Sequence, residues 1–217
     1  MKQITIDVFS DLVCPWCFIG ARRLETALAS LPALPAPVEV KIQYHAFLLD
    51  PATPEEGENL ADRLQRRYGR DPKQMFAVVE SAARESGLTL DFTKVKNTYQ
   101  TLKGHTLIRH AAQKGTQKAL TEALFKAYFL EGRNINSVTE LTAIATQHGF
   151  TAQEVETLLS NPAELELTRA EARQATEQGI TGVPFYVFDG KFAISGGQPP
   201  AVFQTALKKA LEAQLDA

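Results

Sequence analysis

The chain is poor in cysteine, because its 217 residues include only Cys14 and Cys17. A structural disulfide framework uses more cysteines and closes longer loops, so these two are not expected to act as structural cross-links. A zinc site is disfavoured as well, since structural zinc takes four ligands and the four histidines show no paired ligand spacing. The sequence therefore predicts no bound metal, and the cysteine pair needs another explanation.

The sequence also lacks an excess of either charge and a long apolar run. Lys and Arg number 23 against 25 for Asp and Glu, a formal charge of −2. Phosphate binding needs a basic excess or a dense basic patch, so nucleic acid is not an expected partner. No stretch of about 18 apolar residues exists, so no membrane span is expected. Because Asp7 and Asp11 interrupt the first apolar segment, it does not resemble a signal peptide, and a cytoplasmic location is expected.

Two strand signals flank a helix signal at the start of the chain. Residues 4–9 are apolar and β-branched, and residues 38–47 alternate between apolar and polar side chains over much of their length. An apolar face repeats over residues 14–30, as in an amphipathic helix. Three prolines are expected to end this helix: Pro32, Pro35 and Pro37. A short crossover between two such strands predicts a parallel, right-handed βαβ unit.

The middle of the chain carries helix signals and almost no strand signal. Helices are expected over residues 58–68, 72–86, 102–114, 118–131, 138–148, 152–159 and 162–177. Asp71 before Pro72 is typical of a helix start, and Thr151 with Glu154 matches a capping box. Glycines stand where helices are expected to end, at Gly87, Gly115, Gly132 and Gly149. The charged run over residues 62–67 is interpreted as a solvated helix face.

Strand signals return near the C-terminus. Residues 185–188 and 191–194 flank Asp189-Gly190, a dipeptide that favours tight hairpin turns, and a last helix is expected over residues 201–215. The order βαβ, helices, ββα predicts an α/β fold whose two ends pack together. The predicted domains are a discontinuous one over residues 1–54 and 173–217 and an inserted helical one over residues 55–172.

The two cysteines form a Cys14-Pro15-Trp16-Cys17 motif that follows a strand and opens a helix. Free N–H groups and the helix dipole favour an anion at this position, and the thiolate is the nucleophilic form of cysteine. We therefore assign the attacking role to Cys14 and the resolving role to Cys17, which is expected to be more buried. Pro15 suits the first helical turn, and a partly exposed Trp16 offers an apolar contact for substrate. The alternative is a pair of inert buried thiols.

A second motif, Gly182-Val183-Pro184, stands before the predicted hairpin. Together with the Cys-Pro-Trp-Cys helix start and the long helical block, it resembles the thioredoxin-like fold of the DsbA family, and its FrnE-like branch in particular. The resemblance covers essentially the whole chain. It implies that Pro184 is cis and faces the cysteines, and that Val183 offers backbone groups to a substrate chain. The alternative is that Pro184 only begins an edge strand.

A histidine in the helical block is a further candidate. FrnE-like proteins tend to carry Asn-Thr-x-x-Ala-His on a helix of the inserted lobe. Residues 100–105 match this pattern at Thr101 and His105 and depart from it at Gln100 and Gly104. The resemblance implies that His105 faces the active site and contacts substrate; the alternative is a structural or solvated histidine.

Three functions remain open from the sequence. The leading one is a thiol–disulfide oxidoreductase that acts on protein or peptide disulfides with no cofactor besides its own redox-active pair. The second is a glutathione-dependent isomerase or transferase for small molecules, as in the related kappa-class transferases, with glutathione as co-substrate. The third is a redox-sensing module without turnover. The net direction, the electron partner, and the choice between monomer and homodimer stay open.

Overall fold

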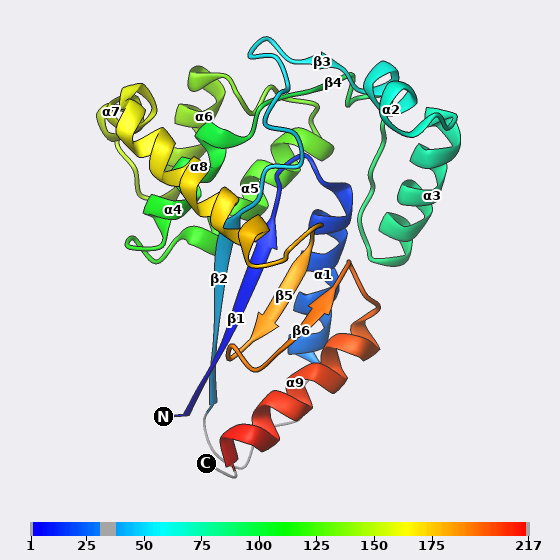
Figure 1. The fold of residues 1–217 in the computed structure, drawn as a ribbon, viewed down its shortest axis with the longest axis vertical. Helices are drawn as coiled ribbons and strands as arrows, with labels where there is room; N and C mark the ends of the chain where they lie inside the picture. The colour runs from blue at the N-terminus through cyan, green and yellow to red at the C-terminus, as the bar shows by residue number, and fades with distance from the viewer. Residues whose placement is uncertain (1, 31–37, 216–217) are drawn as a thin grey trace.

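The two ends of the chain meet in one four-stranded sheet (Figure 1). The computed structural model describes residues 2–30 and 38–215; the three prolines predicted to end the first helix lie outside these residues. The sheet has the order β2-β1-β5-β6. Its strands are β1 (Lys2–Ser10), β2 (Val38–Ala46), β5 (Phe185–Phe188) and β6 (Phe192–Ser195).

The pairing of the strands confirms both predicted units. β1 runs parallel to β2, with Ile4 opposite Val40, and the parallel direction is that of the predicted βαβ unit. β5 pairs antiparallel with β1 on one side and with β6 on the other. The hairpin turns at Asp189 and Gly190, whose φ angles of 50° and 65° are the positive values that this dipeptide tolerates.

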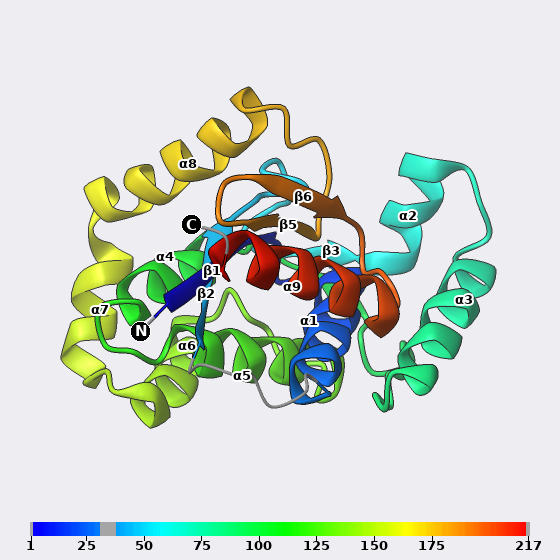
Figure 2. The same ribbon diagram turned by 90° about the horizontal axis from the view of Figure 1, so that it is seen from below.

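Helices cover both faces of the sheet (Figure 2). Successive side chains on a strand point to opposite faces, so Ile4, Ile6 and Val8 share one face and are fully or nearly fully buried. The helices α1 (Pro15–Ala29) and α9 (Pro200–Leu215) pack together on this face. The opposite face carries α8 (Pro162–Glu177), which packs against β2.

The remaining helices form the block between β2 and β5, as predicted. They are α2 (Leu60–Tyr68), α3 (Pro72–Glu85), α4 (Leu102–Ala111), α5 (Gln117–Phe129), α6 (Val138–Ala145), a short 3-10 helix (Thr146–His148) and α7 (Ala152–Ser160). The expected caps form: the Asp71 side chain accepts from the Lys73 N–H, and Thr151 and Glu154 complete a capping box. All four predicted terminal glycines adopt positive φ.

Two short strands correct the expectation for this block. β3 (Glu58–Asn59) pairs antiparallel with β4 (Asn97–Thr98). The helix predicted from residue 58 therefore begins at Leu60, since residue 58 is held in the strand pair and the Asn59 side chain caps the helix. Pairs of two-residue strands carry too little periodicity to be seen in a sequence. The helix predicted to reach residue 114 ends at Ala111.

Candidate functional site

The cysteine motif lies where the loop after β1 meets α1. Cys14 is the residue before the helix, with extended backbone angles of −90° and 111°, and Pro15 occupies the first turn. The loop is fixed by a hydrogen bond from the Cys14 N–H to the Asp11 carbonyl (3.0 Å). The motif therefore sits at the helix N-terminus, as the sequence predicts, although Pro15 has no N–H and the Cys17 N–H donates to the Cys14 carbonyl (3.0 Å).

The two thiols lie 3.3 Å apart, and no disulfide bond joins them. Cys14 is 5% exposed and Cys17 is 2% exposed, so the expected difference in access is present but small. Burial raises the pKa of the Cys17 thiol, and the contact with Cys14 raises it further. Cys17 is therefore held in its protonated form, which suits a thiol that acts second.

The Val183-Pro184 peptide bond is cis and lies against the motif. The Cys14 thiol donates to the Val183 carbonyl at 3.6 Å, although 169 residues separate the two in the chain. Pro184 is buried, and Val183 is partly buried. Only a glycine fits at position 20 of α1, because a Cβ there would lie 2.3 Å from the Tyr186 hydroxyl and 3.3 Å from Pro184. Close packing of α1 against this loop brings the two motifs together.

His105 lies beneath the site rather than in it. It is 3% exposed on α4, and its Nε2 contacts Asp11 Oδ1 at 3.3 Å. The other Asp11 oxygen accepts from the Leu49 N–H at 2.7 Å. Asp11 lines the cavity beside Cys14, whereas His105 does not. His105 therefore reaches the dithiol loop through Asp11, whose role in the site no local sequence pattern indicates.

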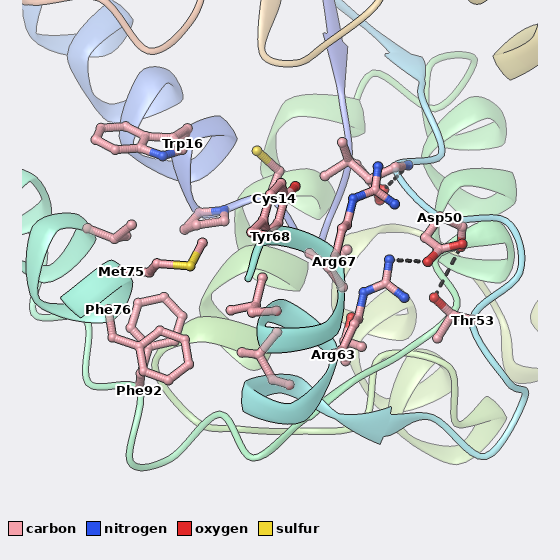
Figure 3. Close-up of a pocket in the computed structure, with 18 of the residues that line it drawn as sticks. Cys14, Trp16, Asp50, Thr53, Arg63, Arg67, Tyr68, Met75, Phe76 and Phe92 are labelled. Atoms are coloured by element: carbon pink, nitrogen blue, oxygen red, sulfur yellow. Dashed lines mark hydrogen bonds and ion pairs between the residues drawn. The ribbon is translucent and has the colours of Figure 1, made fainter. Parts of the chain in front are cut away.

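A cavity of about 400 Å³ lies beside Cys14 (Figure 3). Cys14, Pro15, Trp16 and Val183 line it, and Trp16 is partly exposed there, as expected. The rest of its wall comes mainly from α2, α3 and the loops near them. These residues are Asp11, Val13, Leu49, Asp50, Thr53, Leu60, Arg63, Leu64, Arg67, Tyr68, Arg70, Met75, Phe76, Val79, Phe92, Thr98, Tyr99, Thr101 and Phe129.

The charged run on α2 is largely solvated, as predicted, since α2 has no buried residue, but two of its arginines also line the cavity. Arg63 is only 13% exposed and pairs with Asp50 and Glu58. Arg67 also lines the cavity. Arg63 and Arg67 were not predicted as site residues, because helical periodicity does not reveal where α2 lies relative to Cys14.

Among residues 2–30 and 38–215, no group of three or more His, Cys, Asp or Glu side chains is arranged to hold a metal ion. Within the same residues, no helix is long and apolar enough to cross a membrane. The arrangement offers instead a thiol pair, a backbone carbonyl and a largely apolar cavity.

Solved structures with this architecture are similar over nearly the whole chain. The probable DsbA oxidoreductase SCO1869 from Streptomyces coelicolor is 32% identical over 96% of this chain and 90% of its own, with a TM-score of 0.85. A 2-hydroxychromene-2-carboxylate isomerase is 18% identical over 98% of both chains, with a TM-score of 0.72. The cytosolic disulfide reductase DsbM from Pseudomonas aeruginosa with GSH is 16% identical over 96% of this chain and 99% of its own, with a TM-score of 0.66.

The last two similarities show the shared fold alone, and placement in the FrnE-like branch stays a prediction. The model of the DSBA-like thioredoxin domain matches residues 5–208, which include both cysteines, the cis proline and the whole helical block. The chain therefore belongs to the family of DSBA-like thioredoxin domains.

Proposed function

We propose that this protein is a thiol–disulfide oxidoreductase in which Cys14 attacks the substrate and Cys17 resolves the intermediate. The observation that carries the proposal is the meeting of three groups at the start of α1: the Cys14 thiol, the Cys17 thiol 3.3 Å away, and the Val183 carbonyl 3.6 Å from Cys14 Sγ. Dithiol exchange needs two thiols close enough to form a disulfide and a place for the substrate chain beside them, whereas buried structural thiols need neither.

Each group has a distinct task in the proposed exchange. The Cys14 thiolate attacks one sulfur of a substrate disulfide, which releases one substrate thiolate and leaves a mixed disulfide. Cys17 then loses its proton and attacks Cys14 Sγ, so that the second substrate thiolate leaves and the Cys14–Cys17 disulfide forms. Deprotonation of Cys14 also removes the donor to Val183, and the carbonyl becomes free to accept from a substrate N–H beside Pro184.

We further propose a cytoplasmic setting in which the pair works as a reductase or isomerase. The support is the similarity to DsbM, which is described as a cytosolic disulfide reductase. A cytosolic glutathione and thioredoxin pool keeps exposed dithiols mostly reduced.

The first prediction concerns the two cysteines. The purified protein is expected to catalyse reduction of insulin disulfides by dithiothreitol, measured as turbidity from the released chains. Cys14→Ser is expected to abolish the catalysed rate, since no nucleophile remains at the helix start. Cys17→Ser is expected to accumulate a mixed disulfide, detected by mass spectrometry. Unchanged insulin reduction in Cys14→Ser would show that the assignment is wrong.

A glutathione-dependent isomerase or transferase is the second candidate, and the cavity favours it because a small molecule fits beside the dithiol. The similarity to a small-molecule isomerase and to a protein solved with GSH also supports it. Turnover of a small substrate with glutathione that survives Cys17→Ser would favour this candidate. Loss of all turnover in Cys17→Ser would favour dithiol exchange.

A further inference from the structure

The cavity beside Cys14 has one apolar wall and one basic wall (Figure 3). The apolar wall includes Met75 and Phe76 on α3 and Phe92, and the rings of Phe76 and Phe92 stack with centroids 4.4 Å apart. The basic wall is α2, from which Arg63 and Arg67 extend on the other side of the cavity. Cys14 lies between the two walls, so a bound molecule would touch both of them and the thiol.

The arginines differ in whether their charge is balanced. Arg63 is paired with Asp50 and Glu58. Among the described residues, by contrast, no carboxylate lies within ion-pair distance of Arg67 or Arg70, which also lines the cavity. The Arg67 guanidinium lies instead over the Tyr68 ring, 5.7 Å from its centroid.

The nearby acidic groups are already engaged. Asp11, the other acid in the cavity wall besides Asp50, is 1% exposed and contacts His105 and the Leu49 N–H. The Asp71 carboxylate accepts from the Lys73 N–H at the start of α3. Arg67 and Arg70 therefore stand in the cavity wall without an ion-pair partner among the described residues, opposite an apolar surface.

We propose that this cavity binds low-molecular-weight disulfides that combine an apolar, preferably aromatic, body with an anionic group. This inference rests on the proposed function and names its substrate class. A volume of about 400 Å³ is that of a site for a small molecule. The carboxylate of such a substrate pairs with Arg67, and its apolar body packs on Phe76 and Phe92, which leaves its disulfide facing Cys14.

The reaction at this site is balanced by the dithiol pair. Cys14 Sγ bonds to one sulfur of the bound disulfide and the substrate S–S bond breaks, releasing one anionic aryl thiolate. Cys17 loses its proton and attacks Cys14 Sγ, which displaces the second thiolate and forms the Cys14–Cys17 disulfide. Oxidation of the two cysteines supplies the two electrons that reduce the substrate disulfide to two thiolates, and the two thiol protons pass to solvent. A dithiol reductant returns the enzyme to its starting form.

The test compares two aromatic disulfides. One is 5,5′-dithiobis(2-nitrobenzoate), with a carboxylate on each ring, and the other is neutral 4,4′-dithiodipyridine. Second-order rates of the reduced protein with each reagent are measured by stopped-flow absorbance, and their ratio cancels general changes in Cys14 reactivity. The variant is Arg67→Gln. The matched control is Arg66→Gln, the neighbouring arginine on α2, which pairs with Glu58 and is not part of the cavity wall.

The ratio of the anionic rate to the neutral rate is expected to fall about five- to tenfold in Arg67→Gln, the effect of one lost charge-assisted contact. Arg66→Gln is expected to leave the ratio within about twofold, since a long-range field falls off through the solvent. An unchanged ratio in Arg67→Gln, or an equal fall in both variants, would overturn the proposal.

Binding without chemistry gives a second readout. Trp16 is the only tryptophan and lines the cavity, so its fluorescence reports occupancy. Wild-type protein is expected to bind 3-phenylpropionate about tenfold more tightly than neutral 3-phenylpropanamide, and Arg67→Gln is expected to remove most of that difference. Equal affinity for acid and amide in the wild type would overturn the substrate class.

The two proposals fail in different ways. If the wild type reduces insulin and both aromatic disulfides with dithiothreitol but shows no dependence on Arg67, the oxidoreductase assignment stands and the substrate class is wrong. If it turns over no disulfide with a dithiol, the proposed function itself is wrong.

Discussion

At the scale of single residues, Asp11 connects the dithiol loop to the helical block. Its carbonyl accepts from the Cys14 N–H, and its carboxylate contacts His105 on α4 and the Leu49 N–H after β2. Asp11 and His105 are only 1% and 3% exposed. Buried polar groups are costly when left without a partner, and this pair therefore fixes the position of the loop that carries Cys14.

The pair predicts a measurable coupling. Asp11→Asn and His105→Gln are each expected to lower the free energy of unfolding in urea by about 1–3 kcal/mol, because each leaves a buried group poorly satisfied. The double variant is expected to cost less than the sum of the two, with a coupling energy above about 0.5 kcal/mol. Additive costs in this double-mutant cycle would contradict a direct contribution of the contact.

At the scale of elements, a histidine ties α8 to the sheet. His45 on β2 lies with Nε2 2.7 Å from Asp7 on β1 and with Nδ1 3.2 Å from Glu171 on α8. Burial disfavours the charged imidazolium, but the hydrogen bonds with Glu171 and Asp7 outweigh this effect, and the pKa of His45 is raised. When the ring is protonated, it bridges the Asp7 and Glu171 carboxylates and so holds α8 against the sheet.

This contact predicts a pH dependence of stability. Because the pKa is higher in the folded protein than in the unfolded chain, the stabilisation is fully present below about pH 6.5 and is lost as the pH rises through the folded value. The free energy of unfolding, measured from pH 5.5 to 8.5, is expected to decline less in His45→Gln than in the wild type. His148→Gln, outside this cluster, serves as the control. The same decline in wild type and His45→Gln would contradict the assignment.

At the scale of the whole molecule, one hydrophobic core runs from the sheet into the helical block. The same cluster of buried side chains contains Ile6 of β1, Phe18 of α1 and Phe125 of α5, and the Phe18 and Phe125 rings stack with centroids 5.3 Å apart. Among the described residues, the side chains of the two predicted domains are therefore in apolar contact between α1 and α5. A shared core couples the stabilities of the parts that it joins.

Cooperative unfolding follows from this core. Trp16 fluorescence reports the start of α1 and the cavity wall beside it, and far-ultraviolet circular dichroism reports mainly the helices of the block. The two signals are expected to give the same midpoint and slope in urea. Separate midpoints would show that the division into residues 1–54 with 173–217 and residues 55–172 describes two independently unfolding units.

Much of the fold follows from local signals in the sequence. Asp71, Thr151 and the terminal glycines mark helix ends through backbone chemistry, and the caps form as expected. The cysteine motif at the start of α1 is visible for the same reason. The strand pair at residues 58–59 and 97–98 was missed because its stability comes from a partner distant in the chain.

The sequence by itself determined the thiol pair, its placement at a helix start and the hairpin behind Pro184, because spacing, capping and turn propensities act over a few residues. Only the tertiary structure decided what surrounds Cys14. The basic wall at Arg67 and the Asp11–His105 contact bring together segments far apart in the chain, and such neighbours are chosen by the packing of whole elements. Local physics therefore indicates the chemistry of the site, while packing shapes the cavity in which that chemistry meets a substrate.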